Sequence, residues 1–404
     1  MKRSLRPGHA LQLLEGGRQL FDAMVHAIDQ ARTFVWVETY ILQAANDTLK
    51  VLYALERAAQ RGVDVRLLID AIGTPKPDSL WVARLQRVGV HMQIYRPLGR
   101  LGLLIPSRWR RLHRKLCVVD GVVGFCGGIN LIDDRDDVAL GRLEQPRLDF
   151  ALQVQGPLVL DMQDTMATLW RRTLLVQGVR QRDFALAWQH WQHQRRVLVP
   201  PWASQGEGGV SSHAAQAALL LRDNILHRHD IERAYLKAIG EARQHIIIAN
   251  AYLIPGRRLR RALSVAVQRG VRVQLLIQGK YERFLQYHAA RPVHVALLRA
   301  GVEIHEYAPS ALHAKVAVVD GRWATVGSTN LDPLSLLLAR EANVVTTDRP
   351  FAQELHARLE HLLVSHGVPL DLATLNARPW WQRWQDGLAF AIMRTVLFLT
   401  GHRY

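Results

Sequence analysis

The chain has 404 residues, 49% of them hydrophobic, which is enough for two domains of ordinary size. Its 52 Lys and Arg against 35 Asp and Glu give a net charge of +17, which favours an anionic partner, either nucleic acid or an acidic membrane surface. Two cysteines exclude a disulfide framework, and no apolar core follows Met1, so we expect a reducing, cytosol-facing location without a secretory signal.

Helical stretches alternate with short apolar runs along the chain, and the order repeats. Helical spacing at 49–61 and 258–269 alternates with strand-like runs, and each half ends in two β-type runs joined by Asp-Gly. The segment Arg61–Ile69 returns, nearly unchanged, as Arg269–Ile277. The sequence therefore predicts an α/β fold made of two similar layered domains.

Composition sets the expected domain boundaries. A Gly-, Ser- and Pro-rich linker at 200–212 separates a first domain at 1–199 from a second domain at 213–370. The last part, 371–404, is expected to be an amphipathic tail that associates with a membrane.

Each predicted hairpin carries the same polar pattern. The first copy reads His113-x-Lys115-x4-Asp120, followed by Gly127-Gly128-x-Asn130, and the second copy lies 200 residues later, as His313-x-Lys315-x4-Asp320 and Gly327-Ser328-x-Asn330. A single His-x-Lys in a strand is usually a half-exposed polar face. Two complete copies at a constant offset indicate an enzyme that acts on phosphodiesters.

The Asp-Gly pairs predict two-residue hairpin turns. In that register the residue numbers of each cross-strand pair add up to 241 in the first hairpin and to 641 in the second. That register places His113 opposite Gly128, and it puts Lys115 and Asn130 on the same face. The second hairpin repeats the arrangement with His313, Lys315, Ser328 and Asn330. Each half should then offer an imidazole, an ammonium and an amide beside a residue too small to obstruct a phosphate.

The two aspartates of the pattern have the opposite strand parity. We interpret Asp120 and Asp320 as residues that form the turn and salt bridges more than as groups that touch substrate. Two imidazoles facing one phosphate suggest a nucleophile and a general acid/base, with the lysines and asparagines holding the non-bridging oxygens. No Cys/His cluster has zinc spacing and no Walker or dinucleotide loop is present, so neither a metal nor a cofactor is expected.

The doubled pattern resembles the signature of the phospholipase D superfamily. Within it, the chain is similar to the bacterial cardiolipin synthases, most of all the B type, at Gly327–Ser335, at Glu341-Ala-Asn-Val and at Val37-Glu38-Thr-Tyr40. This resemblance covers nearly the whole chain. It implies two phospholipase D-like α/β sandwich domains related by a pseudo-twofold, with the active site at their interface.

The resemblance also implies a two-step reaction through a phosphohistidine, with His113 as nucleophile and His313 as general acid/base. It suggests that a downstream carboxylate orients each imidazole, Glu341 for His113 and Asp149 for His313. One position departs from the family pattern, because Ala339 stands where relatives commonly carry Asn.

The implied reaction moves a phosphatidyl group from phosphatidylglycerol to the glycerol hydroxyl of a second phospholipid and releases glycerol. Water as the acceptor would make the enzyme a phospholipase D, and the same chemistry on DNA would make it a nuclease. The motifs do not distinguish these acceptors or define an oligomeric state. A nucleic-acid partner is disfavoured because a nuclease groove needs neither of the two segments described next. A non-catalytic membrane-binding descendant is disfavoured because both motifs are complete.

Two apolar and basic segments favour lipid. The insert at 98–112, which the second half lacks, is either an ordinary surface loop or a lip of the active site that contacts lipid. Near the C-terminus, Leu388–Leu399 is too short to span a bilayer, which needs roughly 20 residues, and contains Arg394. Because tryptophans precede it, at 380, 381 and 384, we expect an interfacial helix at the bacterial cell membrane, with packing on the protein core as the alternative.

Overall fold

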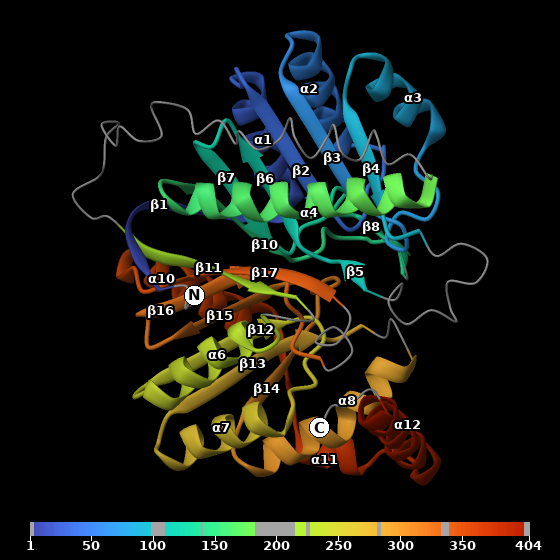
Figure 1. The fold of residues 1–404 in the computed structure, drawn as a ribbon. Coiled ribbons are helices and arrows are strands. Elements are labelled where there is room, and N and C mark those ends of the chain that lie inside the picture. Colours follow the sequence, from blue (N-terminus) through green and yellow to red (C-terminus); the bar gives the residue numbers. More distant parts are fainter. Residues whose placement is uncertain are drawn as a thin grey trace. The chain divides into compact units, whose positions relative to one another are not determined.

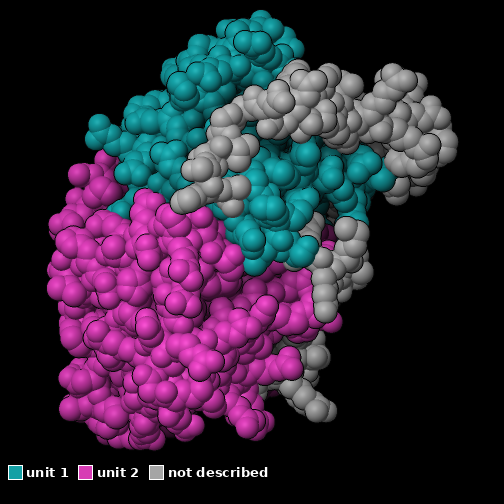
Figure 2. All heavy atoms as spheres, turned by 90° about the vertical axis from the view of Figure 1, so that its left-hand side faces the viewer, with its two compact units in different colours: residues 1–133, 151–219 teal, residues 134–150, 220–404 magenta. Residues whose placement is uncertain are grey.

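The computed structural model describes residues 4–97, 110–138, 140–181, 215–223, 227–280, 284–332 and 339–399. These form two compact units, residues 1–133 with 151–219 and residues 134–150 with 220–404 (Figure 2). Segment 134–150 therefore groups with the second unit, although the sequence-based boundaries place it in the first domain. The expected linker and residues 98–109 of the insert lie outside the described residues.

The first unit contains a mixed sheet with helices on it (Figure 1). Its sheet order is β10-β7-β6-β2-β3-β4, in which β2, β3 and β4 are parallel and the others pair antiparallel. The elements are β1 (Arg6–Glu15), α1 (Gly16–Asp29), β2 (Phe34–Thr39), α2 (Thr48–Gln60), β3 (Asp64–Asp70), α3 (Ser79–Arg87), β4 (His91–Tyr95), β5 (Arg111–Leu112), β6 (Lys115–Val119), β7 (Val123–Gly127), β10 (Phe150–Gln155) and α4 (Leu158–Gln181). Strand β11 (Ala215–Arg222) begins in this unit, and its last three residues belong to the second unit.

Alternate residues of the central strands enter different layers of this unit. Leu67 and Ile69 of β3 belong to the core formed with α1 and α2, whereas Leu68 between them packs with Leu169 and Trp170 of α4. Both faces of the sheet are thus covered by helices, which explains the continuous apolar runs Phe34–Val37 in β2 and Leu67–Ile69 in β3. This is the layered α/β arrangement that the sequence predicts.

The second unit repeats the sheet order, as β17-β16-β15-β12-β13-β14, and adds β18 at the end. Its elements are β8 (Asp136–Asp137), β9 (Gly141–Arg142), α6 (Asp230–Glu241), β12 (His245–Asn250), α7 (Arg257–Gln268), β13 (Arg272–Gln278), α8 (Phe284–Arg299), β14 (Glu303–Tyr307), β15 (Lys315–Val319), β16 (Trp323–Gly327), β17 (Ala339–Thr346), α10 (Arg349–His366), β18 (Gly367–Leu370), α11 (Leu372–Asn376) and α12 (Trp380–Leu399). The internal duplication read from the sequence therefore extends to the topology.

The two motif hairpins have the predicted turn but not the predicted register. Both turn aspartates have positive φ, 52° and 51°, as do the glycines that follow, and a Val122 N–H···O=C Val119 bond of 3.0 Å closes the first turn. Val122 is an extra residue, however, and pairing resumes at Val123, so opposed residues sum to 242 and, in the second hairpin, 642. The expected sums of 241 and 641 were wrong by one.

This shift changes which residues face one another. Gly127 lies opposite Lys115, where the expected register placed Cys126. Strand parity therefore does not place Asn130 on the lysine face, and the argument that did so was wrong. Gly128 and Asn130 belong to the loop that follows β7, so their positions depend on loop contacts, as do those of Ser328 and Asn330 after β16.

The C-terminal helix α12 packs on α8 within the second unit. Asp386 accepts a hydrogen bond from Arg378 Nη1 (2.7 Å) and pairs with His288 Nδ1 (2.6 Å), and Ala389 and Met393 are buried along the same side. None of the helices in the described part of the chain is long and apolar enough to cross a membrane.

Candidate active site

The first motif lies in the first unit, where β6 begins. Lys115 is almost fully buried, and its Nζ donates to the carbonyl oxygen of His113 at 2.6 Å. Tyr40 follows β2 directly, and its ring centroid lies 5.0 Å from the centroid of the His113 ring. The same centroid of Tyr40 lies 5.4 Å from Lys115 Nζ. Tyr40 thus contacts both motif side chains, a role that sequence reasoning did not assign to it.

A buried ion pair fixes the strand that carries this motif. Arg114 contacts both carboxylate oxygens of Glu38, with its Nη2 at 2.9 Å from Oε1, and also donates to the carbonyl oxygen of Thr165 at 3.2 Å. Both charged side chains are nearly inaccessible to water. Breaking such a pair leaves an uncompensated buried charge, so it strongly favours one position of the strand.

The two motif asparagines have different surroundings. The Oδ1 of Asn130 accepts a hydrogen bond from the backbone N–H of Ile41 at 3.2 Å, so this side chain holds its own loop against the end of β2. Asn330 is equally buried, but its Oδ1 has no hydrogen-bond partner among the described residues. In the second unit Asn250 holds the corresponding loop instead. Its side-chain amide donates a hydrogen bond to the carbonyl oxygen of Thr329 and accepts one from the backbone N–H of Leu331.

The second motif has a complete hydrogen-bonded arrangement within its own unit. His313 Nδ1 lies 2.6 Å from Oδ2 of Asp149, and the other carboxylate oxygen accepts the N–H of Phe150 at 2.8 Å. A carboxylate only accepts, so the imidazole proton resides on Nδ1 and Nε2 carries the lone pair of the neutral ring. The structure thus brings together the two residues that the resemblance paired.

Lys315 completes this group. Its side chain is fully buried, its Nζ donates to the carbonyl oxygen of His313, and the same nitrogen lies 4.0 Å from Asp149 Oδ2. A buried ammonium needs a nearby negative charge. Asp149 supplies that charge while it orients the histidine, so one carboxylate serves both motif residues.

The motif aspartates are structural anchors in the structure. Asp120 accepts hydrogen bonds from the backbone N–H groups of Arg32 (2.8 Å), Thr33 (2.9 Å) and Phe34 (2.9 Å) and from the Thr33 hydroxyl (2.6 Å). Burial acts to raise the pKa of Asp120, but these bonds outweigh it and the pKa is lowered. Asp320 accepts equivalent N–H groups, from residues 243, 244 and 245, at 2.8–2.9 Å.

The Gly-[Gly/Ser] element follows each hairpin. In the second unit, the Ser328 hydroxyl donates to the fully buried Glu341 and accepts the N–H of Ala342 at 3.1 Å. A Cβ on Gly327 would lie 2.3 Å from the Asn343 side chain, so only glycine fits there. Gly128, the counterpart of Ser328, is buried and offers no side chain to a nearby carboxylate.

Arg222 adds a positive charge to the surroundings of Glu341. Burial lowers the pKa of Arg222 to about 10, and the negative charge of Glu341 opposes that shift. At neutral pH the guanidinium therefore remains protonated. No sequence signal pointed to this residue, because it lies outside both motifs.

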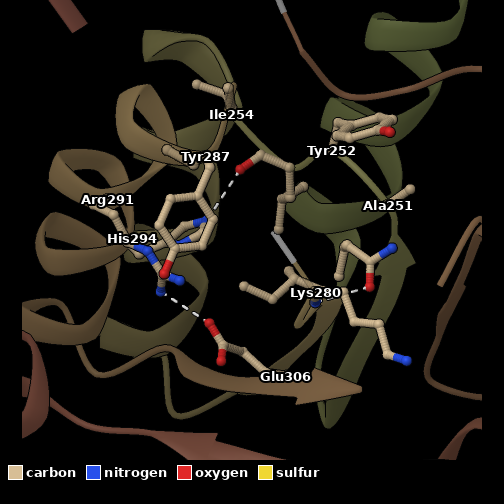
Figure 3. A pocket seen from close by; sticks show the side chains of 12 residues that line it. Ala251, Tyr252, Ile254, Lys280, Tyr287, Arg291, His294 and Glu306 are labelled. Carbon is tan, nitrogen blue, oxygen red and sulfur yellow. Dashed lines mark hydrogen bonds and ion pairs between the residues drawn. The ribbon is translucent and has the colours of Figure 1, made fainter. Parts of the chain in front are cut away.

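A pocket of about 470 Å³, open mouth included, lies beside the second motif, where β12 and β13 end (Figure 3). Gln278 in its wall exchanges hydrogen bonds with the backbone of Leu312, the residue before His313. Arg291 is paired with Glu306 at 2.8 Å. Burial, and to a lesser degree the positive charge of Arg291, lowers the pKa of His294 to about 3, so His294 is neutral at physiological pH. Lys280 adds a positive charge to a largely apolar lining.

Comparisons with known proteins agree with this arrangement. The family model described as "Cardiolipin synthase, PLD-like domain" matches residues 24–135 and 235–363. Cardiolipin synthase B of Salmonella typhi is 38% identical over 402 residues, covering 99% of this chain and 92% of that protein, and cardiolipin synthase B of Escherichia coli K12 is 37% identical with the same coverage.

A solved structure supports the fold. Phosphatidylserine synthase from Haemophilus influenzae superposes with a TM-score of 0.68 at 14% identity, covering 98% of this chain and 96% of that one. The fold is thus that of an α/β protein with two phospholipase D-like domains. With matches of this extent, the chain belongs to the cardiolipin synthase family of proteins with phospholipase D-like domains.

Proposed function

We propose that this protein transfers a phosphatidyl group from phosphatidylglycerol to the glycerol hydroxyl of a second phosphatidylglycerol. The products are cardiolipin and glycerol. One phosphodiester replaces another, so the reaction requires no activated nucleotide.

In the first step an imidazole nitrogen of His113 attacks phosphorus, and the phosphorus–oxygen bond to the departing glycerol breaks. His313 begins this step as the imidazolium, protonated on both ring nitrogens, and gives its Nε2 proton to the glycerol oxygen as it leaves. In the second step His313 takes the proton of the incoming hydroxyl, whose oxygen attacks phosphorus and breaks the phosphorus–nitrogen bond. Both histidines return to their starting states.

The supporting residues stabilise the charge that develops on phosphate. Lys115, Lys315, Asn130 and Asn330 would hold the non-bridging oxygens, which is the role of preorganised donors in such reactions. Asp149 keeps the proton on Nδ1 of His313, so that Nε2 is the nitrogen that exchanges protons with substrate. Glu341 is proposed to do the same for His113.

The observation that carries the proposal is the 2.6 Å contact between His313 and Asp149, beside the buried Lys315. The pair of His288 with Asp386 has the same geometry but no lysine motif, whereas His313 combines the oriented imidazole with a buried ammonium suited to hold phosphate. The relatives' name, cardiolipin synthase B, supports the choice of phosphatidylglycerol as substrate.

The test is an incubation of purified protein with phosphatidylglycerol vesicles, followed by separation of the lipids and measurement of released glycerol. Cardiolipin and glycerol in equal amounts are expected, with neither formed by the matched His313→Ala protein. Phosphatidic acid as the main lipid product would instead identify a hydrolase. Cleavage of plasmid DNA in a parallel incubation, without cardiolipin formation, would identify a nuclease.

We also propose that α12 docks the protein peripherally on the cytosolic face of an anionic bacterial membrane. Opposite the side packed on α8, four apolar residues spaced by four are exposed: Trp380 (80%), Trp384 (64%), Leu388 (44%) and Ile392 (46%). An exposed apolar stripe that begins with tryptophans is suited to the interface between lipid headgroups and acyl chains. The alternatives of interfacial helix and core packing are thus compatible, because the two functions use different faces of α12.

Charge supports the same proposal. Arg383 and Arg394 are both exposed on α12, and each cation near an anionic bilayer contributes about 1 kcal/mol to the free energy of membrane binding.

Both cysteines of the chain are buried and not disulfide-bonded, which is compatible with a reducing compartment.

A further inference from the structure

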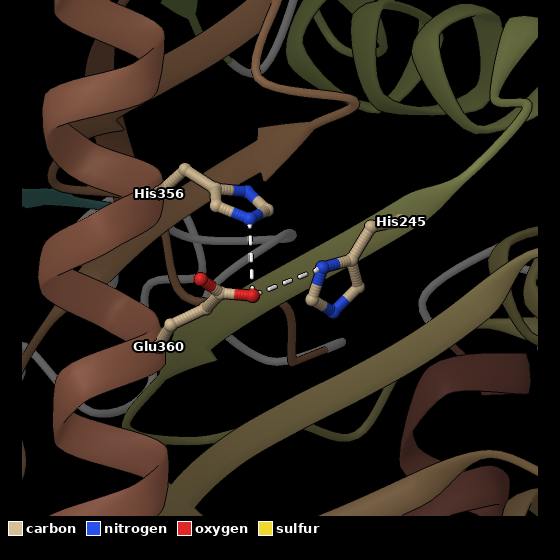
Figure 4. A group of neighbouring side chains, drawn as sticks. All are labelled: His245, His356 and Glu360. Atoms are coloured by element: carbon tan, nitrogen blue, oxygen red, sulfur yellow. Dashed lines mark ion pairs between the residues drawn. The ribbon is translucent and has the colours of Figure 1, made fainter.

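Three potential metal ligands from two elements lie close together in the second unit (Figure 4). His356 and Glu360 are four residues apart on α10, so they share one face of that helix. His245 begins β12. One oxygen of Glu360, Oε1, lies 3.2 Å from His356 Nε2 and 3.7 Å from His245 Nδ1.

The environment of His245 prepares its Nδ1 for coordination. Arg272 donates to both oxygens of Glu303 at 2.9 Å, and the Gln274 amide nitrogen donates to the same carboxylate at 2.8 Å. The amide oxygen of Gln274 therefore faces His245 Nε2, at 2.8 Å, and must accept a hydrogen bond from an N–H at that nitrogen. This leaves the lone pair of the neutral ring on Nδ1, which points at Glu360.

A histidine that donates one ring N–H to a fixed acceptor and offers the other nitrogen has the support typical of metal-bound histidines.

The spacing fits a small tetrahedral ion. Zinc–nitrogen and zinc–oxygen bonds of about 2.0–2.1 Å place neighbouring ligand atoms about 3.3 Å apart in a tetrahedron. The contacts of 3.2 Å and 3.7 Å bracket that value, and all three ligand atoms lie within 4.8 Å of one another. Glu360 has a side chain 48% exposed, so an ion can enter from solvent.

We propose that His245, His356 and Glu360 bind one Zn²⁺, with water as a fourth ligand. Two imidazoles and a carboxylate form a donor set that suits zinc. The site would tie α10 to β12, and the backbone N–H of His245 already donates to Asp320 at 2.9 Å. Zinc there would therefore stabilise the base of the second motif hairpin without touching substrate, and the inference does not depend on the proposed reaction.

The test uses the full chain without an affinity tag, stripped of metal and titrated with zinc by calorimetry. One ion per chain is expected, with an increase in the thermal unfolding temperature. Glu360→Gln preserves the shape of the side chain but removes its charge. It should weaken binding by more than the 10- to 100-fold that loss of an outer partner typically costs. His361→Ala, an exposed neighbour on the same helix, is the matched control and should bind as the wild type does.

The chain has 18 histidines, so weak zinc binding elsewhere must be distinguished. Co²⁺ provides this second measurement, because a tetrahedral site gives intense visible absorption that scattered surface histidines do not. The absorption should appear with the wild type and with His361→Ala and disappear with His356→Ala. Equal zinc affinity of the wild type and Glu360→Gln, or no tetrahedral cobalt spectrum with the wild type, would overturn the proposal.

Discussion

Replacement of Asp120 by Asn tests whether the motif aspartates hold the hairpin or act on substrate. The change preserves the size of the side chain. One amide oxygen can still accept from Thr33 and Phe34, but the new NH₂ group faces the N–H of Arg32, which the carboxylate accepts at 2.8 Å. One hydrogen bond to a charged group is lost and a donor is left opposite another donor.

The size of the effect follows from these contacts. A hydrogen bond to a charged group contributes about 1.5–3 kcal/mol, and an unsatisfied partner costs about 1–3 kcal/mol. Because the two contributions overlap, we expect Asp120→Asn to lower the free energy of unfolding by about 2–4 kcal/mol. Asp22→Asn is the control, since that side chain is 58% exposed and should change stability by less than about 0.5 kcal/mol.

Urea unfolding followed by tryptophan fluorescence measures the difference. The lowered pKa of Asp120 means that its contribution is present above the unfolded-state pKa, near 3.9, and is lost as the pH falls through the folded-state pKa. The gap between wild type and Asp120→Asn should therefore narrow below about pH 4. A variant as stable as the wild type that has lost all lipid turnover would refute this reasoning and make Asp120 a catalytic group.

Three further predictions concern the proposed site and α12. Either His113→Ala or His313→Ala should abolish cardiolipin formation without unfolding the protein, and a trapped phosphoryl group should map to His113; recovery of the label on His313 would reverse the assigned roles. Asp149→Asn should reduce kcat by about 100-fold or more, because the imidazole loses its fixed tautomer, while KM for phosphatidylglycerol changes little; unchanged kcat would show that the contact is only structural. Trp380→Ser with Trp384→Ser should weaken sedimentation with phosphatidylglycerol vesicles, and added salt should weaken it further, yet turnover of a soluble short-chain substrate should persist; vesicle binding equal to that of the wild type at every salt concentration would exclude the exposed face of α12 as the docking surface.

The sequence was sufficient for the features that repeat. Apolar runs between helical stretches predicted layered α/β halves, and the Asp-Gly pairs predicted turns that the structure has at Asp120 and Asp320. These features depend on local preferences, which the residues themselves carry. The resemblance also paired Asp149 with His313, and the structure contains that contact.

The sequence did not determine the register. One unpaired residue after each turn, Val122 in the first hairpin, moves every later residue by one position, and no local pattern distinguishes a turn with a bulge from a turn without one. The positions of Asn130 and Asn330 therefore depend on contacts with distant loops, which explains why one is held by Ile41 and the other is not.

Residues distant in sequence meet only when the chain folds. His245 lies more than a hundred residues before His356 and Glu360, so no spacing rule for zinc could find the three together. The same holds for Arg114 with Glu38, which pair because neighbouring strands bring them to one buried position. Sequence fixes which chemical groups each element carries; tertiary packing alone decides which of those groups share a site, because the distances between elements are set by how their apolar faces fit together.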